Sequence, residues 1–303
     1  MWLNWALTDS GLPGKPLPIT KTDKHTALPY SIIDSHQHFW KYDPVRDRWI
    51  GDGMDVLKKD FLPVDLLPEL DNNGVDGCVA VQASESDQET SFLLELAGRN
   101  TFIKGVVGWI DLESPTLEQQ LHSYQQYPLL KGFRPMLQSD PQRDKMLQPA
   151  FLNGVRLLQE YGFTLDLIIL PDQLDYCAEL ALMFPRMKLV IDHLGKPPVR
   201  SGNLDAWTKS IRRYRDLQNV YCKVSGLVTE ADWLHWTKPQ LMPAIDQVVE
   251  TFGTSRIMFG SDWPVCLLAA GYTEVMDILD GYFSPADQQQ FYAGNACAFY
   301  SIT

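Results

Sequence analysis

Cysteine is scarce in this sequence and follows no pairing pattern. The 303 residues include five cysteines, which lie far apart and form no Cys-x-x-Cys pair: Cys78, Cys177, Cys222, Cys266 and Cys297. Several stand inside apolar runs, where cysteine behaves as a small buried hydrophobe. This odd, dispersed set contains no disulfide framework, and we therefore expect a cytoplasmic protein.

Long apolar runs and basic residues are also in short supply. No run approaches the roughly 18 apolar residues that a membrane span needs, and the N-terminus lacks the basic region of a signal peptide. Lys and Arg number 26 against 38 Asp and Glu, giving a net charge of −12. We therefore expect a small-molecule substrate, with no nucleic-acid partner and no membrane association. A homo-oligomer is compatible with the sequence.

The first 30 residues differ from the rest of the chain. They contain Pro13, Pro16, Pro18 and Pro29, scattered charges and no hydrophobic periodicity. Such a segment is typical of irregular structure laid over a domain. We predict an N-terminal extension over residues 1–30 and a single domain over residues 31–303.

From residue 31 onward, short β-branched runs alternate with longer amphipathic segments. Eight runs are predicted to be strands: Ser31–His38, Val75–Gln82, Ile103–Ile110, Leu130–Arg134, Thr164–Leu170, Lys188–His193, Val220–Ser225 and Arg256–Asp262. Five intervening segments carry apolar residues at helical spacing and are predicted to be helices: Ser86–Arg99, Lys145–Tyr161, Asp172–Phe184, Leu204–Tyr214 and Pro239–Phe252.

This alternation predicts the α/β class. Near-continuous apolar strands are typical of a parallel sheet that is covered on both faces. Eight strand–helix units in about 250 residues predict a (β/α)8 TIM barrel. A doubly wound open sheet is the main alternative, but no Gly-x-Gly-x-x-Gly turn follows any early strand.

Two alternating histidines end the first predicted strand. Because successive side chains of a strand point to opposite faces, we expect Asp34, His36 and His38 to share one face. Two imidazoles about 6–7 Å apart on that face can share a metal ion or flank a substrate carbonyl. The same short pattern also arises in ordinary cores. The residues at the ends of the other strands therefore decide between a functional site and a core pair.

Reactive side chains stand at the ends of the other predicted strands as well, where barrel enzymes place their active sites. They are Gln82, Trp109, Arg134, His193, Lys223 and Asp262. Each has a structural alternative: His193 as a core histidine, Asp262 as a helix N-cap, and Lys223 as a cation facing outward. Their gathering at one end of one sheet favours a functional site.

Three of these motifs together resemble one enzyme family. They are Asp34-x-His36-x-His38, the run Asp-His-Leu-Gly-Lys-Pro beginning at Asp192, and the run Gly-Ser-Asp-Trp-Pro beginning at Gly260. The chain resembles the amidohydrolase superfamily, and within it the amidohydrolase-2 branch that contains sugar lactonases such as L-fuconolactonase. The resemblance extends from about Ile32 to Tyr300.

The resemblance implies roles for particular residues. His36 and His38 would bind a divalent metal ion, most simply zinc, together with Asp262 and His193. His193 would be metal-linked or would polarise the substrate, and Asp262 would take a proton from the attacking water. The fifth predicted strand offers no histidine ligand and the fourth offers Arg134 rather than a bridging lysine. We therefore expect one metal ion at most, and members of this branch that work without metal leave metal-independent catalysis open.

The resulting prediction is a hydrolase that opens a small sugar lactone. Asp262 would act as general base and then as general acid, while a metal ion or the histidines His36, His38 and His193 polarise the carbonyl. Five residues are predicted to bind substrate: Arg134, Trp40, Trp109, Gln82 and Trp263.

Two alternatives remain at this stage. One is a metal-dependent decarboxylase of an unsaturated or aromatic acid, another activity of the superfamily that the missing fifth-strand histidine disfavours. The other is a non-catalytic binding barrel, in which Asp262 would be dispensable. Substrate specificity is expected to depend on the loops over residues 43–60 and 228–238.

Overall fold

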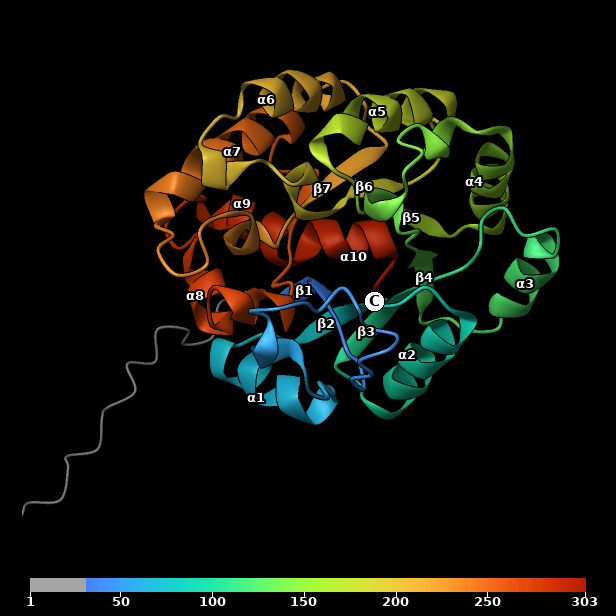
Figure 1. The fold of residues 1–303 in the computed structure, drawn as a ribbon, viewed down its shortest axis with the longest axis horizontal. Helices are drawn as coiled ribbons and strands as arrows, with labels where there is room; N and C mark the ends of the chain where they lie inside the picture. Colours follow the sequence, from blue (N-terminus) through green and yellow to red (C-terminus); the bar gives the residue numbers. More distant parts are fainter. Residues whose placement is uncertain (1–30) are drawn as a thin grey trace, which may run out of the picture.

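The strands of the protein form a ring surrounded by helices (Figure 1). The structure, a computed structural model, describes residues 31–303. All eight strands are parallel to their neighbours and follow each other in chain order around the sheet. They are β1 (Ile33–Gln37), β2 (Gly77–Val81), β3 (Ile103–Gly108), β4 (Leu130–Phe133), β5 (Thr164–Leu167), β6 (Leu189–Ile191), β7 (Val220–Val224) and β8 (Ile257–Phe259). The predicted TIM barrel is confirmed, whereas the predicted extension over residues 1–30 lies outside the described residues.

Helices follow the strands and cover the outside of the ring (Figure 1). They are α1 (Pro63–Asn73), α2 (Asp87–Arg99), α3 (Leu117–Tyr124), α4 (Pro149–Tyr161), α5 (Leu174–Met183), α6 (Asp205–Ile211), α7 (Lys238–Phe252), α8 (Tyr272–Asp277), α9 (Pro285–Gln289) and α10 (Asn295–Tyr300). The five predicted helices correspond to α2, α4, α5, α6 and α7. Within residues 31–303, no helix is both long and apolar enough to cross a bilayer.

The ring closes between β1 and β8 through a short parallel bridge that joins Gln37 to Trp263. The backbone N–H of Asp262 donates to the carbonyl of His36 at 2.8 Å, and the N–H of His38 donates to the carbonyl of Trp263 at 2.7 Å. This closure places His36 of β1 and His38, just past its end, beside Asp262.

The last helix closes one end of the barrel. Ala296 and Phe299 of α10 pack with interior residues of the strands such as Ile33, Val79 and Met258. The Nζ of Lys188, just before β6, donates to the carbonyls of Ala298 and Phe299, both at 2.9 Å. Since α10 covers the N-terminal ends of the strands, the C-terminal ends are left for the site.

Several strands end earlier than predicted. β5 ends at Leu167 rather than Leu170, β6 at Ile191 rather than His193, and β8 at Phe259 rather than Asp262. His193 and Asp262 have φ angles of 53° and 58°. This left-handed conformation is incompatible with an extended ladder, so both residues lie just past their strands.

The predicted shared face of Asp34, His36 and His38 is wrong. The register between β1 and β2 shifts between Asp34 and Gln37, so the strict alternation of side chains is lost there. The Asp34 carboxylate accepts hydrogen bonds from the N–H of Ser261 at 2.9 Å and the hydroxyl of Tyr272 in α8 at 3.0 Å. Asp34 therefore faces the helical layer and braces the β8 turn, while the histidines face inward.

Candidate active site

A cavity of about 250 Å³ lies among the residues that follow the strands. It is lined by aromatic, apolar and charged side chains: His38, Trp40, Trp49, Met54, Ala83, Arg134, Met136, Gln138, Ile168, His193, Lys196, Thr229, Glu230, Trp233, Asp262, Val265 and Leu268. A concave, largely apolar wall with a few convergent polar groups is the usual form of a small-molecule site.

His36, His38 and Asp262 come together at the base of this cavity. The Nε2 atoms of the two histidines are 3.2 Å apart. The Oδ1 atom of Asp262 lies 3.4 Å from Nε2 of His38 and 3.8 Å from Nε2 of His36. Two nitrogen ligands of a tetrahedral zinc ion are roughly 3.3 Å apart. These three buried residues can therefore hold a divalent metal ion.

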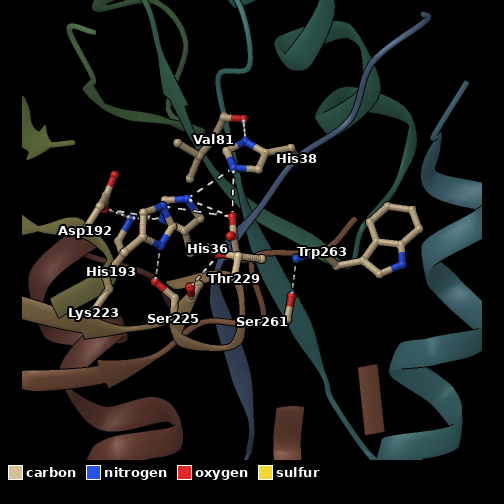
Figure 2. Close-up of polar contacts among 12 residues, drawn as sticks. His36, His38, Val81, Asp192, His193, Lys223, Ser225, Thr229, Ser261 and Trp263 are labelled. Atoms are coloured by element: carbon tan, nitrogen blue, oxygen red, sulfur yellow. Dashed lines mark hydrogen bonds and ion pairs between the residues drawn. The ribbon is translucent and has the colours of Figure 1, made fainter. Parts of the chain in front are cut away.

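The hydrogen bonds of His38 make its Nε2 atom available as a ligand. Its Nδ1 atom lies 2.8 Å from the carbonyl oxygen of Val81. A carbonyl only accepts, so Nδ1 carries the ring proton and Nε2 of the neutral ring keeps its lone pair. Figure 2 shows this nitrogen directed toward His36.

His36, Asp192 and His193 form a second buried group with metal-ligand atoms close together. Nδ1 of His36 lies 3.3 Å from Oδ1 of Asp192. That oxygen also forms an ion pair with the ammonium of Lys223 at 3.2 Å. A buried carboxylate oxygen beside a histidine is suited to orienting a metal-bound imidazole.

His193 is held neutral against the cavity. Burial lowers the pKa of its imidazole to about 4, and its Nδ1 atom lies 2.9 Å from Oγ of Ser225. Gly226 makes room for the ring, since a Cβ there would lie 2.5 Å from Nδ1 of His193 and 2.9 Å from Oδ2 of Asp262. The sequence-based reasoning did not single out Gly226.

Asp262 is ionised at neutral pH despite its burial. Burial by itself would raise the pKa of the carboxyl group, but the neighbouring histidines His193, His36 and His38 outweigh burial and hold that pKa below its usual range. The carboxylate is thus in the form that accepts a proton.

Arg134 lines the cavity and keeps one of its hydrogen-bond donors unpaired. Its side chain is buried, and its NH1 group pairs with Oδ2 of Asp192 at 3.1 Å. NH2 donates to the carbonyl of Gln82. The remaining Nε–H group is buried and has no hydrogen-bond partner in the described residues. A buried donor without a partner is an incentive to bind an acceptor on a ligand.

The structure places two predicted substrate residues away from the cavity. Gln82 is fully buried and its amide donates to the carbonyl of Arg134 at 2.7 Å, so it braces the arginine from behind. Trp109 lines a separate hollow together with Glu85 and Asp111. The fixed direction of side chains at each strand end decides which of them reach the centre.

The two other predicted tryptophans differ from each other. Trp40 lines the cavity, and its indole N–H donates to the carbonyl of Lys59 at 2.9 Å. Trp263 is buried against Phe61, with ring centroids 5.2 Å apart, and Figure 2 shows its indole directed away from the histidines. Trp263 therefore packs the barrel wall and does not line the cavity.

Several cavity residues were missed as individual sites although their segments drew attention. Trp49 lies in the loop over residues 43–60, and Glu230 and Trp233 lie in the loop over residues 228–238. Lys196, in the motif that begins at Asp192, pairs with Glu230 at 2.8 Å. Trp49 is the one tryptophan of the charge-rich loop over residues 43–60, and this was the available signal for it.

The chain is similar to known proteins over most of its length. Residues 33–302 match the family model described as Amidohydrolase. The chain belongs to the amidohydrolase family. It is 38% identical over 288 residues to an L-fucono-1,5-lactonase of Burkholderia multivorans, covering 89% of this chain and 96% of that protein. An L-fucono-1,5-lactonase of Burkholderia ambifaria is 35% identical over 277 residues, covering 89% of this chain and 95% of that protein.

Solved structures agree on the fold. A crystal structure of an amidohydrolase from Burkholderia multivorans with bound zinc superimposes with a TM-score of 0.87 at 37% identity, covering 90% of this chain and all of that one. A 5-carboxyvanillate decarboxylase from Sphingomonas paucimobilis is 15% identical, with a TM-score of 0.61 and coverage of 90% and 100%. This second similarity concerns the fold alone.

Proposed function

We propose that this amidohydrolase opens a small sugar lactone by direct attack of water. The observation that carries the proposal is Asp262, an ionised carboxylate buried among histidines at the base of a tryptophan-lined cavity. The two relatives named L-fucono-1,5-lactonase support a sugar lactone as the substrate class. An aldonolactone is an activated cyclic ester, so no covalent nucleophile is required.

Asp262 handles the proton. As water attacks the lactone carbonyl carbon, one of its protons passes to the carboxylate of Asp262, and a C–O bond forms. Collapse of the tetrahedral intermediate breaks the bond to the ring oxygen, which takes this proton from Asp262 and leaves as a hydroxyl group. The same side chain thus acts as general base and then as general acid.

Donors around the cavity stabilise the charge on the carbonyl oxygen. When the hydroxyl of Ser225 donates to Nδ1 of His193, the neutral ring presents Nε2–H. The partnerless Nε–H of Arg134 is a second donor. Buried, preorganised donors are worth far more to a developing oxyanion than the same groups in water.

His36, His38 and Asp262 would hold a metal ion in this site, and His193 adjoins them at 4.0 Å from Oδ1 of Asp262. A divalent ion such as zinc, when bound, supplies Lewis-acid polarisation of the carbonyl and a water of lowered pKa. The protein's own groups at Arg134 and His193 remain in place in either case.

The outer part of the cavity suits a sugar ring. Trp40 and Trp49 lie edge to face with ring centroids 5.7 Å apart, and Trp233 lines the same cavity. Indole faces pack against the apolar side of a sugar. The ion pair between Lys196 and Glu230 offers both a donor and an acceptor for hydroxyl groups.

A panel of aldono-1,4- and 1,5-lactones tests the proposal, with acid release followed in a pH-stat. We expect at least one 6-deoxyhexonolactone to open well above the buffer rate. Metal-independent catalysis predicts this rate both after chelation and after zinc addition, whereas metal-dependent catalysis predicts it only after zinc addition. A panel with no rate above buffer under either condition would contradict lactone hydrolysis. Release of carbon dioxide from an aromatic acid would instead favour the decarboxylase alternative.

A further inference from the structure

Lys223 in β7 is a fully buried cation beside the histidine pair. The predicted alternative, that it faces outward between helices, is wrong, since its ammonium group contacts Asp166 and Asp192 inside the barrel. Its Nζ atom lies 2.5 Å from Oδ2 of Asp166, 3.2 Å from Oδ1 of Asp192 and 3.0 Å from Nδ1 of His36. Figure 2 shows Lys223 and Asp192 on the side of His36 away from His38.

The charges around Lys223 balance inside the barrel. Lys223 and Arg134 provide two cations, and Asp166 and Asp192 provide two carboxylates. The hydroxyl of Tyr300 in α10 also donates to Asp166 at 2.6 Å. Buried charges are tolerated when they are paired and hydrogen-bonded in this way. The network therefore links the floor of the barrel to His36.

Two cations favour opposite proton arrangements of His36. NH1 of Arg134 approaches Nε2 at 3.4 Å and favours a ring proton on Nδ1. The bond from Lys223 to Nδ1 is shorter, at 3.0 Å; because an ammonium group only donates, it makes Nδ1 the acceptor and leaves the proton of the neutral ring on Nε2. That Nε2–H faces Nε2 of His38 at 3.2 Å, whose lone pair accepts because its own ring proton is used on Val81. The histidine pair is thus held together by the protein's own hydrogen bonds.

A metal ion on His36 needs the opposite arrangement. Nε2 must then offer its lone pair, and the ring proton must lie on Nδ1, where it would face the ammonium of Lys223. The acceptor available for it is Oδ1 of Asp192, which is 3.3 Å away and is also paired with the Lys223 ammonium at 3.2 Å. Lys223 and Asp192 therefore compete for the same nitrogen.

We propose that Lys223 is a positioning residue that holds His36 and His38 assembled without metal. Its bond to His36 must be exchanged for a bond between His36 and Asp192 before His36 can ligate a metal ion. The contribution of Lys223 to turnover rests on the proposed lactonase function, whereas its effect on metal affinity does not.

The test compares zinc affinity between the wild-type protein and the double variant Lys223→Met with Asp166→Asn. This variant removes one charge of each sign, so the net charge is unchanged, and the amide oxygen introduced by Asp166→Asn can still accept from Tyr300. Losing a hydrogen bond from a charged donor predicts zinc binding about 10- to 100-fold tighter, measured by competition with a chromophoric chelator. Equal or weaker affinity in the folded variant would overturn the proposal.

Lys188→Met is the matched control, because Lys188 contacts carbonyls of α10 and not the site. Its zinc affinity should equal that of the wild type. If the double variant fails to fold, two-bond 1H–15N histidine spectra of the metal-free wild type decide: a His36 ring protonated on Nε2 supports the proposal and one protonated on Nδ1 contradicts it. An inactive wild type would refute the lactonase function while leaving both of these measurements able to decide the role of Lys223.

Discussion

At the scale of single residues, the site depends on backbone conformations that most side chains avoid. His193 and Asp262 occupy the left-handed region, which costs of order 1–3 kcal/mol per residue. Such conformations persist only where the surroundings hold them, and here Gly226 allows the close approach. The sequence motifs identified His193 and Asp262 correctly as neighbours. Gly226 could not be identified in the same way, because it contributes only the lack of a side chain.

Gly226→Ala is predicted to damage the site directly. Its Cβ would lie 2.5 Å from Nδ1 of His193 and 2.9 Å from Oδ2 of Asp262, at a φ of 59°. We expect kcat for lactone opening to fall about 100-fold, since displaced catalytic groups of this kind commonly cost that much. Gly202→Ala is the control, because its φ is 71° and nothing lies within 4 Å of its Cβ. Similar kcat losses in both variants would contradict the collision.

At the scale of elements, the periodicity of the strands and helices predicted the architecture but not the strand ends. The β1 register shift turns Asp34 outward, and no local pattern in the sequence marks a bulge there. Lys223 was equally ambiguous, because a lone lysine among small residues has the same pattern whether it faces helices or the barrel interior. Its direction became clear only from its contacts with Asp166 in β5 and Asp192 just past the end of β6.

The loops after β1 and β7 are predicted to set substrate affinity. Trp49 is 43% exposed and lines the cavity, so Trp49→Ala should leave the free energy of unfolding nearly unchanged. Loss of a partly exposed aromatic contact to the sugar is expected to raise KM about 5- to 10-fold with little effect on kcat. Val45→Ala, in the same loop but outside the cavity lining, is the control. An unchanged KM for Trp49→Ala would exclude a substrate contact.

At the scale of the whole molecule, the two ends of the barrel differ in role: one end is packed closed and the other contains the candidate site. The helix α10 seals the N-terminal ends of the strands, and the cavity opens where the strands stop. The sequence could predict that the site lies at the C-terminal ends of the strands, because polar residues follow strands that are otherwise apolar. It could not predict which polar residues reach the centre, since Trp109, Gln82 and Trp263 are aimed elsewhere by their strands.

The central claim is that Asp262 carries out the proton transfer of lactone hydrolysis, and Asp262→Asn tests it most directly. Asparagine keeps the shape and tolerates the left-handed backbone, so the fold should persist by circular dichroism. Asp172→Asn, which removes a carboxylate paired with Arg143 at 2.8 Å, is the control. We predict that kcat on the best lactone falls about 10²- to 10⁴-fold in Asp262→Asn and stays at the wild-type value in Asp172→Asn. A folded Asp262→Asn protein that retains wild-type kcat would contradict the account.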